Sequence, residues 1–301
     1  MRIVVFGAGS LGSLLGGTLA REHDVTLVAR DAHASAVREE GLRIEGELET
    51  VVHPNVTTDG TDLESDIALL TVKSFDTESA AKTLATGTFD AVCSLQNGMG
   101  NEETLGAHLE TTILSGTATY GAMLRDPGVV ECTGLGDIVL GPNGGGQSTL
   151  ADRVGDAFDR AGLETTVACD MPFRRWKKLA VNTGINPITA LTVVENGTVL
   201  EPPASAISRA ATRETARVAR ENGVSLSNRE ALEAVRTVAT LTRNNTSSMA
   251  QDVLAGRRTE IDAINGYVVD RAAERGIDVP TNRLLTELVR TWEQGHTPNR
   301  T

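Results

Sequence analysis

The sequence predicts an α/β domain followed by an all-helical domain, over residues 1–169 and 170–301 respectively. A β-branched run at Arg2–Phe6 leads directly into a glycine-rich loop, and strand-like and helix-like segments then alternate through the first half of the chain. After about residue 170 the strand signal largely disappears. Alternating strands and helices are typical of βαβ units on a parallel sheet, whereas helical patterns alone predict a separate helical domain.

The first domain is expected to contain a parallel sheet that ends in some antiparallel pairing. Its buried-strand candidates are Arg2–Phe6, Asp24–Ala29, Asp66–Val72 and Ala91–Leu95. Three further candidates follow, and we expect them to finish the same sheet: Thr112–Thr119, Val129–Cys132 and Ile138–Leu140. Helices are expected between strands, as at Asp76–Leu84, and again at 149–161.

The second domain is expected to be helical throughout. Its helical patterns cover residues 172–186, 203–221, 228–242, 248–255, 259–274 and 281–294. Gly223, Gly256 and Gly276 each follow one of these patterns. Glycine readily takes the left-handed conformation that ends a helix, so these residues support the predicted boundaries.

Composition limits the class of protein and of partner. With 40% hydrophobic and 23% charged residues, the chain is expected to be soluble and globular rather than disordered. It has no signal-peptide pattern and no apolar run near the roughly 18–20 residues of a membrane span, so no membrane partner is expected. The formal net charge of −12 argues against a nucleic-acid partner, because phosphate binding needs clustered Lys and Arg.

The acidity is diffuse and accompanies a scarcity of lysine. Only four of the 28 basic residues are lysines, a usage typical of a protein from a salt-loving organism, so we interpret the charge as adaptation to solvent. A lysine that remains is then more often one with a chemical role. Three widely spaced cysteines predict a reducing cytoplasm without disulfides or a zinc site, and five dispersed histidines indicate no metal site.

The glycine-rich loop reads Gly7-Ala8-Gly9-Ser10-Leu11-Gly12, between the first strand and a helix. This is the G-x-G-x-x-G fingerprint of a Rossmann dinucleotide-binding domain in its required context. The first glycine permits a tight turn, the second lets a pyrophosphate approach the backbone, and the third permits close helix–strand packing. The helix N-terminus then offers free N–H groups to the phosphates.

The second strand ends at Arg30-Asp31, which bears on the choice of cofactor. An acidic residue at this tip accepts from the ribose hydroxyls of NAD, whereas an arginine favours the 2′-phosphate of NADPH. Arg30 therefore predicts NADPH. Two alternatives remain for Asp31. Either it is the acidic residue that accepts from the ribose hydroxyls, with Arg30 turned to solvent, or it is the N-cap of the next helix.

Two later strand ends carry polar candidates. Lys73 closes the strand at Asp66–Val72, at the edge where open sheets bind ligands, and is either a cofactor contact or an exposed lysine. Asn97 follows the strand at Ala91–Leu95 and is aimed at a nicotinamide or substrate, unless Asn97-Gly98 is a plain turn.

The helix predicted from residue 172 carries Lys178, Asn182 and Asn186 at positions i, i+4 and i+8. This spacing places one amine and two amides on one helix face. Asn is unfavourable inside a helix, so a substrate-binding face explains the pattern better than a solvated face. Pro187 disfavours helical geometry at Asn186, which is expected at a kink or terminus, out of line with the other two.

Two further polar residues have structural as well as functional interpretations. Ser248 with Gln251 matches a capping box at the start of a short helix. Glu260 lies at the start of the helix predicted from 259, where an acid is stabilising without any chemistry.

Together these segments resemble the ketopantoate reductase family, in the family's order and approximate spacing over nearly the whole chain. The segments that carry the resemblance are Gly7–Gly12, Thr71–Lys73, Asn97–Gly100, Trp176–Asn182, Ile185–Pro187, Asn196-Gly197, Ser247–Met249 and Thr259–Asp262. The glycine motif is generic, but the lysine–asparagine helix followed by Ser-Ser-Met and Thr-Glu-Ile-Asp is specific to the family.

The resemblance implies a two-domain NADPH-dependent reductase of a small 2-keto acid, and a role for each residue. Lys178, rather than the adjacent Lys177, would be the general acid and hydrogen-bond the substrate, and Asn97 would contact nicotinamide and substrate. Glu260 would close the site at cofactor and substrate. The remaining substrate contacts would be Asn182, Asn186, Asn196 and Ser248. The remaining cofactor contacts would be residues 7–12, Arg30, Lys73 and Ala122, the last being the weakest match. Gln96 departs from the family's pattern.

Two other functions remain open. One is a reductase of the same fold that acts on another 2-keto acid or on an imine. The other is a nucleotide-binding sensor without catalysis, which would need Gly7–Gly12 and Arg30 but not Lys178, Asn182, Ser248 and Glu260 together. Dimers are common for such folds, so a homodimer is an expectation without an interface signature.

Overall fold

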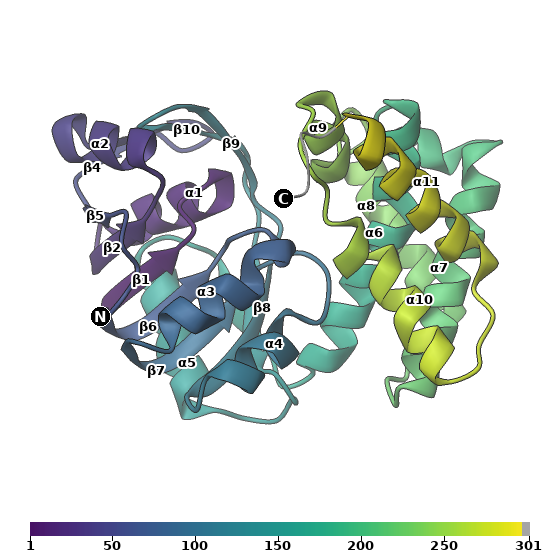
Figure 1. The fold of residues 1–301 in the computed structure, drawn as a ribbon, viewed down its shortest axis with the longest axis horizontal. Helices are drawn as coiled ribbons and strands as arrows, with labels where there is room; N and C mark the ends of the chain where they lie inside the picture. The colour runs from purple at the N-terminus through teal and green to yellow at the C-terminus, as the bar shows by residue number, and fades with distance from the viewer. Residues whose placement is uncertain (297–301) are drawn as a thin grey trace. The chain divides into compact units, whose positions relative to one another are not determined.

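The computed structural model describes residues 1–296, which divide into two compact units. Unit 1 comprises Met1–Gln96 and Asn101–Met171, and unit 2 comprises Asn97–Gly100 and the chain from Pro172 onward. The α/β class of the first and the helical class of the second are as predicted (Figure 1). The short segment Asn97–Gly100 is the exception, because it packs with the helical unit although both its neighbours belong to unit 1.

The main sheet of unit 1 has the strand order β12-β11-β8-β7-β6-β1-β2-β5. Its neighbouring strands are parallel except for β8 and β11, which pair antiparallel. The bounds are β1 Arg2–Phe6, β2 Asp24–Val28, β5 Asn55–Thr57, β6 Glu64–Leu70, β7 Thr88–Ser94, β8 Thr112–Ala118, β11 Ile138–Pro142 and β12 Thr165–Val167. The predicted parallel strands are confirmed to within a few residues.

Helices cover both faces of this sheet, as the alternation of its side chains requires. In β1, Ile3 and Val5 lie in one apolar cluster with α1 and α5, whereas Val4 lies in another with α3 and α4. Figure 1 shows α3 and α4 over one face. The helix bounds are α1 Ser10–Leu19, α2 Asp31–Glu40, α3 Thr77–Leu84, α4 Asn101–His108 and α5 Thr149–Arg160, with a 3₁₀ turn η1 at Ser74–Asp76.

A second, smaller sheet packs on the opposite side of α1. Its strand order is β4-β3-β10-β9, with bounds β3 Leu42–Gly46, β4 Thr50–Val52, β9 Gly121–Asp126 and β10 Val129–Gly134. The prediction that Val129–Cys132 continues the main sheet is therefore wrong. Glycines of α1 explain the arrangement: a Cβ on Gly16 would lie 2.5 Å from Leu27 of the main sheet, and one on Gly17 would lie 2.8 Å from Leu42 of the small sheet.

Unit 2 is helical, as predicted. The bounds are α6 Met171–Thr192, α7 Ala204–Glu221, α8 Asn228–Leu241, α9 Ser248–Leu254, α10 Asn265–Glu274 and α11 Pro280–His296, with 3₁₀ turns η2 Asn196–Leu200 and η3 Ile261–Ala263. Gly223, Gly256 and Gly276 have positive φ, which confirms their role at helix ends. Two helix predictions need correction, because α6 continues to Thr192 and the helix expected from 259 begins only at Asn265.

Within residues 1–296, no helix has the length and apolarity that a membrane-spanning helix needs. Over the same residues, no cluster of His, Cys, Asp or Glu is suited to hold a metal ion.

Candidate active site

The glycine loop after β1 is held tightly by its neighbours. Gly7 has φ +107°, and a Cβ on it would lie 2.6 Å from the Val72 side chain. The N–H groups of Gly7 and Ala8 both donate to the Val28 carbonyl, at 3.2 and 2.9 Å. A Cβ on Gly12 would lie 2.4 Å from the Gly7 carbonyl oxygen. Two of the three motif glycines are therefore required by the chain itself.

Gly9 differs, because the space beside it is open. A Cβ on Gly9 would meet its nearest atom, the Gly7 carbonyl oxygen, only at 4.0 Å. Gly9 is the N-cap residue of α1, and among residues 1–296 no side chain caps the helix there. The first N–H groups of α1 thus face a space that a pyrophosphate would fill. These residues fit a dinucleotide.

The strand that carries Ala122 lies beside the start of α1. The Leu124 backbone N–H donates to the Ser10 hydroxyl at 3.0 Å, and β9 packs along α1. Ala122 lies two residues before Leu124 on the same strand. This strand, which the sequence analysis did not assign, brings Ala122 to the glycine-loop end of unit 1.

Arg30 follows β2 and is the N-cap residue of α2. The alternative that Asp31 caps this helix is wrong, because Asp31 is its first residue and Arg30 occupies the cap position. Both side chains are exposed. One turn further, His33 is buried between α1 and the β9–β10 turn. Its imidazole pKa is lowered by burial and, to a smaller degree, by the positive charge of Arg30.

Lys73 follows a strand end that contacts the glycine loop. Thr71, two residues earlier, donates its hydroxyl to the Gly7 carbonyl at 2.9 Å. Lys73 itself is partly buried and is the N-cap residue of η1. The structure therefore places Lys73 at the carboxyl edge of the main sheet, as predicted from its position after the strand.

The Asn97–Gly100 segment packs against the turn that follows Glu260. The Met99 N–H donates to the Ala263 carbonyl at 2.9 Å, and a Cβ on Gly98 would lie 2.6 Å from the Ala263 Cβ. A Cβ on Gly100 would lie 3.6 Å from the Tyr267 ring. Asn97 and Glu260, which are far apart in sequence, therefore belong to neighbouring segments of unit 2.

Glu260 is only 6% exposed and precedes η3. The predicted placement in the first turn of a long helix is wrong, because the chain forms the η3 turn before α10 begins. Thr259 fixes this turn: its N–H and its hydroxyl both donate to the buried Glu293 carboxylate, each at 2.7 Å. Neither Thr259 nor Glu293 is assigned a role by the sequence motifs, and both support Glu260 from the side of α11.

Lys178, Asn182 and Asn186 lie on one uninterrupted helix. Of the two places expected for Asn186, a kink or a terminus, the terminus is wrong, since α6 continues past Pro187 to Thr192. Lys178 and Asn182 are half-buried and Asn186 is buried. The steps of four residues keep all three on one face.

Asn265 explains why α6 tolerates Pro187. A proline leaves the carbonyl four residues earlier without its helical donor, and here that carbonyl belongs to Thr183. The Asn265 side-chain amide donates to the Thr183 oxygen at 3.4 Å and to Asn282 Oδ1 at 2.9 Å. A side chain from α10 thus compensates the hydrogen bond that α6 lacks.

Asn196 is buried, and its amide donates to the Thr242 hydroxyl at 3.0 Å. Its Oδ1 atom is buried without a hydrogen-bond partner among the described residues. A buried carbonyl oxygen without a donor is costly, so this atom is suited to accept from a bound hydroxyl group.

Ser248 is exposed and is the first residue of α9. The capping-box interpretation is wrong by one residue, because the cap is Ser247, whose hydroxyl accepts from the Ala250 N–H at 3.1 Å. The Ser247 hydroxyl is also 2.7 Å from that of Thr189 on α6. Ser247 therefore fixes α9 to the lysine–asparagine helix and leaves Ser248 outside the cap.

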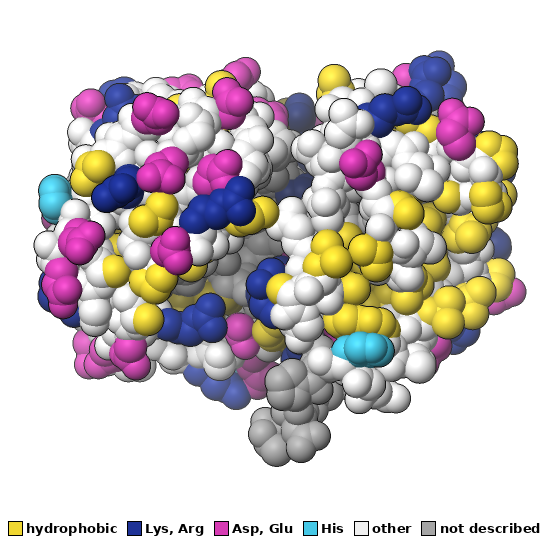
Figure 2. All heavy atoms as spheres, turned by 90° about the horizontal axis from the view of Figure 1, so that it is seen from above, with side chains coloured by type: hydrophobic (Ala, Val, Ile, Leu, Met, Phe, Trp, Pro, Cys, Tyr) yellow, Lys and Arg dark blue, Asp and Glu magenta, His cyan; other side chains and the backbone are white. Residues whose placement is uncertain are grey.

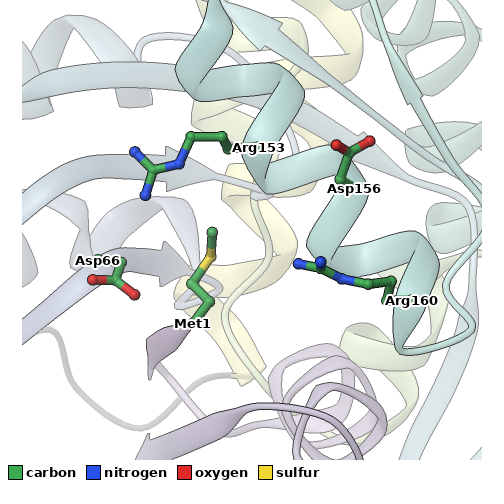
Figure 3. Close-up of a pocket in the computed structure, with 5 residues that line it drawn as sticks. All are labelled: Met1, Asp66, Arg153, Asp156 and Arg160. Atoms are coloured by element: carbon green, nitrogen blue, oxygen red, sulfur yellow. The ribbon is translucent and has the colours of Figure 1, made fainter.

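A surface hollow of about 390 Å³ in unit 1 lies elsewhere (Figure 3). It is lined by Met1 and Asp66, near the amino ends of β1 and β6, and by Arg153, Asp156 and Arg160 of α5. The glycine loop follows the carboxyl end of β1, so this hollow is at the opposite edge of the sheet. None of the predicted site residues lines it.

The fold and these residues define a class of protein: a dinucleotide-binding α/β unit with a helical unit that carries a buried, polar helix face. The comparisons with known proteins agree. A family model described as "Ketopantoate reductase PanE/ApbA" matches residues 3–145, and its C-terminal counterpart matches residues 170–293.

Individual relatives match over nearly the whole chain. The 2-dehydropantoate 2-reductase of Halobacterium salinarum is 43% identical over 298 residues, which cover 96% of this chain and 98% of the relative. A solved PanE/ApbA family ketopantoate reductase from Ralstonia eutropha is 33% identical with a TM-score of 0.90, covering 98% of this chain and 99% of that one. A D-mandelate dehydrogenase solved with NADH and anilino(oxo)acetate shares the fold, with a TM-score of 0.91 at 24% identity, covering 98% of this chain and 99% of that one.

The chain belongs to the ketopantoate reductase family. It is accordingly an oxidoreductase that uses a nicotinamide dinucleotide.

Proposed function

We propose that this protein reduces 2-dehydropantoate (ketopantoate) to pantoate with NADPH, a step in the biosynthesis of pantothenate and coenzyme A. The observation that carries the proposal is the face of Lys178, Asn182 and Asn186 on the unbroken helix α6. An amine and two amides on one partly buried face suit a small substrate that bears a ketone, a hydroxyl and a carboxylate. The names and identities of the relatives support the same substrate.

In this proposal the Rossmann domain, residues 1–169, binds the cofactor. Backbone N–H groups of residues 7–12 hold the pyrophosphate at the start of α1. Arg30 binds the 2′-phosphate, Lys73 lies at the ribose or phosphate, and Ala122 contacts the cofactor from β9. Arg30 favours NADPH over NADH because its planar guanidinium binds a phosphate in a bidentate manner.

The helical domain, residues 170–301, supplies the proton and holds the substrate. The reduced nicotinamide, when bound, supplies a hydride to the ketone carbon. The Lys178 ammonium hydrogen-bonds the ketone oxygen, stabilises the negative charge that grows there and gives it a proton, so that the product is an alcohol. Asn97 and Glu260 orient the reacting groups. The hydroxyl and carboxylate of the substrate are bound by Asn182, Asn186, Asn196 and Ser248.

Two observations bear on the alternatives. The D-mandelate dehydrogenase of the same fold was solved with NADH, so the fold alone leaves both substrate and cofactor open. A sensor without catalysis needs no lysine on the substrate-binding helix, whereas this chain carries two of its four lysines there, and one of them, Lys178, is half-buried.

The proposal extends to the setting of the enzyme. We propose that it acts in the cytoplasm, which is supported by its cysteines: Cys93, Cys132 and Cys169 are all free. We also propose a homodimer. In support, Leu284 and Leu288, one turn apart on α11, are 60% and 45% exposed, and Figure 2 shows hydrophobic side chains gathered over unit 2.

The substrate and cofactor are tested by steady-state kinetics in high-salt buffer. Oxidation of NADPH is followed by its absorbance with ketopantoate and with a panel of other 2-keto acids and imines, and each assay is repeated with NADH. We expect the highest kcat/KM for ketopantoate with NADPH. Tight NADPH binding by the folded protein without ketopantoate turnover would contradict the substrate assignment, and equal use of NADH would contradict the role of Arg30.

A further inference from the structure

Four buried polar side chains form a chain of hydrogen bonds at the carboxyl ends of β6 and β7. Ser94 donates to Gln96 Oε1 at 3.1 Å, and the Gln96 amide donates to the Thr77 hydroxyl at 2.8 Å. Thr77 in turn donates to Asn101 Oδ1 at 2.9 Å. All four residues are at most 8% exposed. The Thr77 hydroxyl lies in the middle and acts as acceptor and donor at once.

This chain of hydrogen bonds joins the two stems of the Asn97–Gly100 segment. Gln96 is the residue before the segment and Asn101 is the residue after it. Both stems bond to the single hydroxyl of Thr77, the first residue of α3. The Gln96 amide also donates to the Val72 carbonyl at 3.0 Å, directly before Lys73. One hydroxyl therefore fixes both ends of the segment to the sheet edge.

The segment itself is fixed elsewhere. Gly98 and Gly100 have φ of +80° and +92°, and the Met99 N–H donates to Ala263 in unit 2. Asn97 is thus the first residue after Gln96, whose side chain is held by hydrogen bonds. Any shift of Gln96 moves the backbone of Asn97 directly, because the two are covalent neighbours.

We propose that Thr77 is a positioning residue, which sets the place of Asn97 by holding Gln96 and Asn101 together. The part of this proposal that concerns turnover rests on the proposed function, in which Asn97 contacts nicotinamide and substrate. Valine has the shape of threonine but neither donates nor accepts, so Thr77→Val removes both hydrogen bonds and little else. Serine retains both.

Loss of the hydroxyl is expected to reduce kcat more than it changes the binding of cofactor. Displacement of a reacting group by about 1 Å can cost up to roughly 100-fold in rate. Partial loosening of Asn97 through its stem is expected to lower kcat roughly 10-fold in Thr77→Val. The KM for NADPH should stay close to that of the wild type, because the glycine loop is unchanged.

A first experiment compares Thr77→Val with Thr77→Ser and with Thr83→Val. Thr83 is the matched control, since it lies on the same helix, is only partly buried and also donates its hydroxyl, to the Ser79 carbonyl at 3.1 Å. Hydrogen exchange of the Gly98 and Met99 amides is measured without substrate or cofactor. We expect faster exchange in Thr77→Val and wild-type exchange in the other two. Unchanged exchange in Thr77→Val would overturn the proposal, whatever the enzyme reduces.

A double-mutant cycle shows whether Thr77 acts through Asn97. We expect Thr77→Val to lower kcat in the wild type, with rescue by Thr77→Ser, and to have little further effect in an Asn97→Ala background. The same fold-loss in both backgrounds would overturn the proposal. Should Thr77→Val not fold, Asn101→Ala releases one stem alone and is judged by the same exchange and kcat measurements. Absence of turnover in the wild type would contradict the proposed function. In that case the hydrogen-exchange measurement alone tests whether Thr77 positions the Asn97–Gly100 segment.

Discussion

At the scale of the residue, the glycines of the loop are constrained for different physical reasons. Gly12 is fixed by the chain, because a Cβ would lie 2.4 Å from the Gly7 oxygen and 2.5 Å from the Thr71 hydroxyl. Gly9 has φ −85° and open space around it, so alanine fits there in the isolated protein. In the proposed complex, it is the bound pyrophosphate that makes the size of residue 9 matter.

Gly9→Ala and Gly12→Ala are therefore expected to separate binding from stability. Gly12→Ala should lower the free energy of unfolding by about 1–3 kcal/mol, as overpacking does. Gly9→Ala should leave the melting temperature unchanged and weaken NADPH binding by about tenfold or more, which is at least 1.4 kcal/mol. Thermal unfolding and fluorescence titration with NADPH measure the two effects. Wild-type NADPH affinity in Gly9→Ala would contradict the location of the pyrophosphate.

His33 connects three elements of unit 1. Its Nδ1 accepts from the Gly128 N–H at 2.9 Å, and its Nε2 is 3.0 Å from the Ser13 hydroxyl of α1. An accepting Nδ1 requires that Nε2 carry the proton, so the imidazole is neutral. Burial, aided by the charge of Arg30, lowers its pKa below the ordinary value of about 6.5.

The sign of this shift predicts a loss of stability in acid. As the pH falls below about 6.5, the unfolded chain binds a proton at His33 before the folded protein does, so this residue's contribution to stability declines. His33→Asn retains an acceptor for Gly128 without the titration. We expect the wild type to have the higher melting temperature. The difference between the two proteins should be largest above pH 7 and smallest near pH 5. A difference that widens toward pH 5 would show the opposite pKa shift.

The sequence places the loop glycines between a strand and a helix, and Lys178 and Asn182 on one helix face, because their spacing itself encodes the geometry. It does not distinguish Ser247 from Ser248 as the N-cap, since the two serines are adjacent at the start of the same helix and either hydroxyl suits the position. The cap of α2 is a similar case. There Asp31 is the better cap by residue preference, but the backbone places the cap at Arg30, one residue earlier.

At the scale of the element, the continuity of α6 decides the geometry of the candidate site. A helix that ended near residue 186 would turn Asn186 away from Lys178 and Asn182. The donor that permits continuity, Asn265, comes from another helix 82 residues further along the chain. Local sequence rules predict a break at Pro187, and only tertiary structure supplies the compensating amide.

Removal of that amide should be costly, and less so when the proline is also removed. Asn265→Ala deprives the Thr183 and Asn282 oxygens of a donor inside the protein, with an expected loss of about 1–3 kcal/mol in the free energy of unfolding. Pro187→Ala restores an N–H that can bond the Thr183 carbonyl within the helix. The cost of Asn265→Ala should then be smaller by about 1 kcal/mol, as chemical denaturation of the four proteins would measure. Purely additive effects would refute this role of Asn265.

Several short strands are among the elements that the sequence did not reveal, together with β3 and β9. β4, β5 and β12 have three residues each, too few for a period of two to be recognised. The sequence predicts β10 as a strand, but the sheet to which β10 belongs depends on which other strands pair with it. Gly17 of α1 permits the close approach of a second sheet, and nothing in the local pattern of residues 129–134 encodes that.

At the scale of the whole molecule, the grouping of residues 97–100 with the helical unit was not predictable from local pattern. These residues follow a Rossmann strand in the usual order, and their contacts with Ala263 and Tyr267 join segments more than 150 residues apart. The two-domain organisation was visible because the strand signal ends near residue 170. The exact bounds of the two units depend on contacts between residues that are far apart in sequence.

The net charge of −12 predicts a dependence of stability on salt. On the face in Figure 2, acidic side chains are spread over unit 1 among basic ones rather than clustered. Repulsion across such a surface is screened when the Debye length falls from about 30 Å at 0.01 M to about 3 Å at 1 M salt. Exposed ion pairs weaken at the same time, but each contributes only about 0–1 kcal/mol.

We therefore expect the melting temperature to rise from 0.01 to 1 M sodium chloride, concentrations that span this range of screening. Sodium chloride is preferred to sulfate, because sulfate also strengthens apolar burial. An uncharged solute of the same osmolality is the control. A melting temperature that falls with salt would show that ion pairs outweigh the net repulsion.

The central claim is that Lys178 is the general acid of a ketopantoate reductase. The most direct test is the kcat/KM for ketopantoate, with NADPH, in Lys178→Ala and in Lys177→Ala, an exposed lysine one residue away. We expect a loss of about 100-fold or more for Lys178→Ala, with NADPH still bound, and a change within about twofold for Lys177→Ala. Wild-type kcat/KM in Lys178→Ala, or an equal loss in both variants, would contradict this claim.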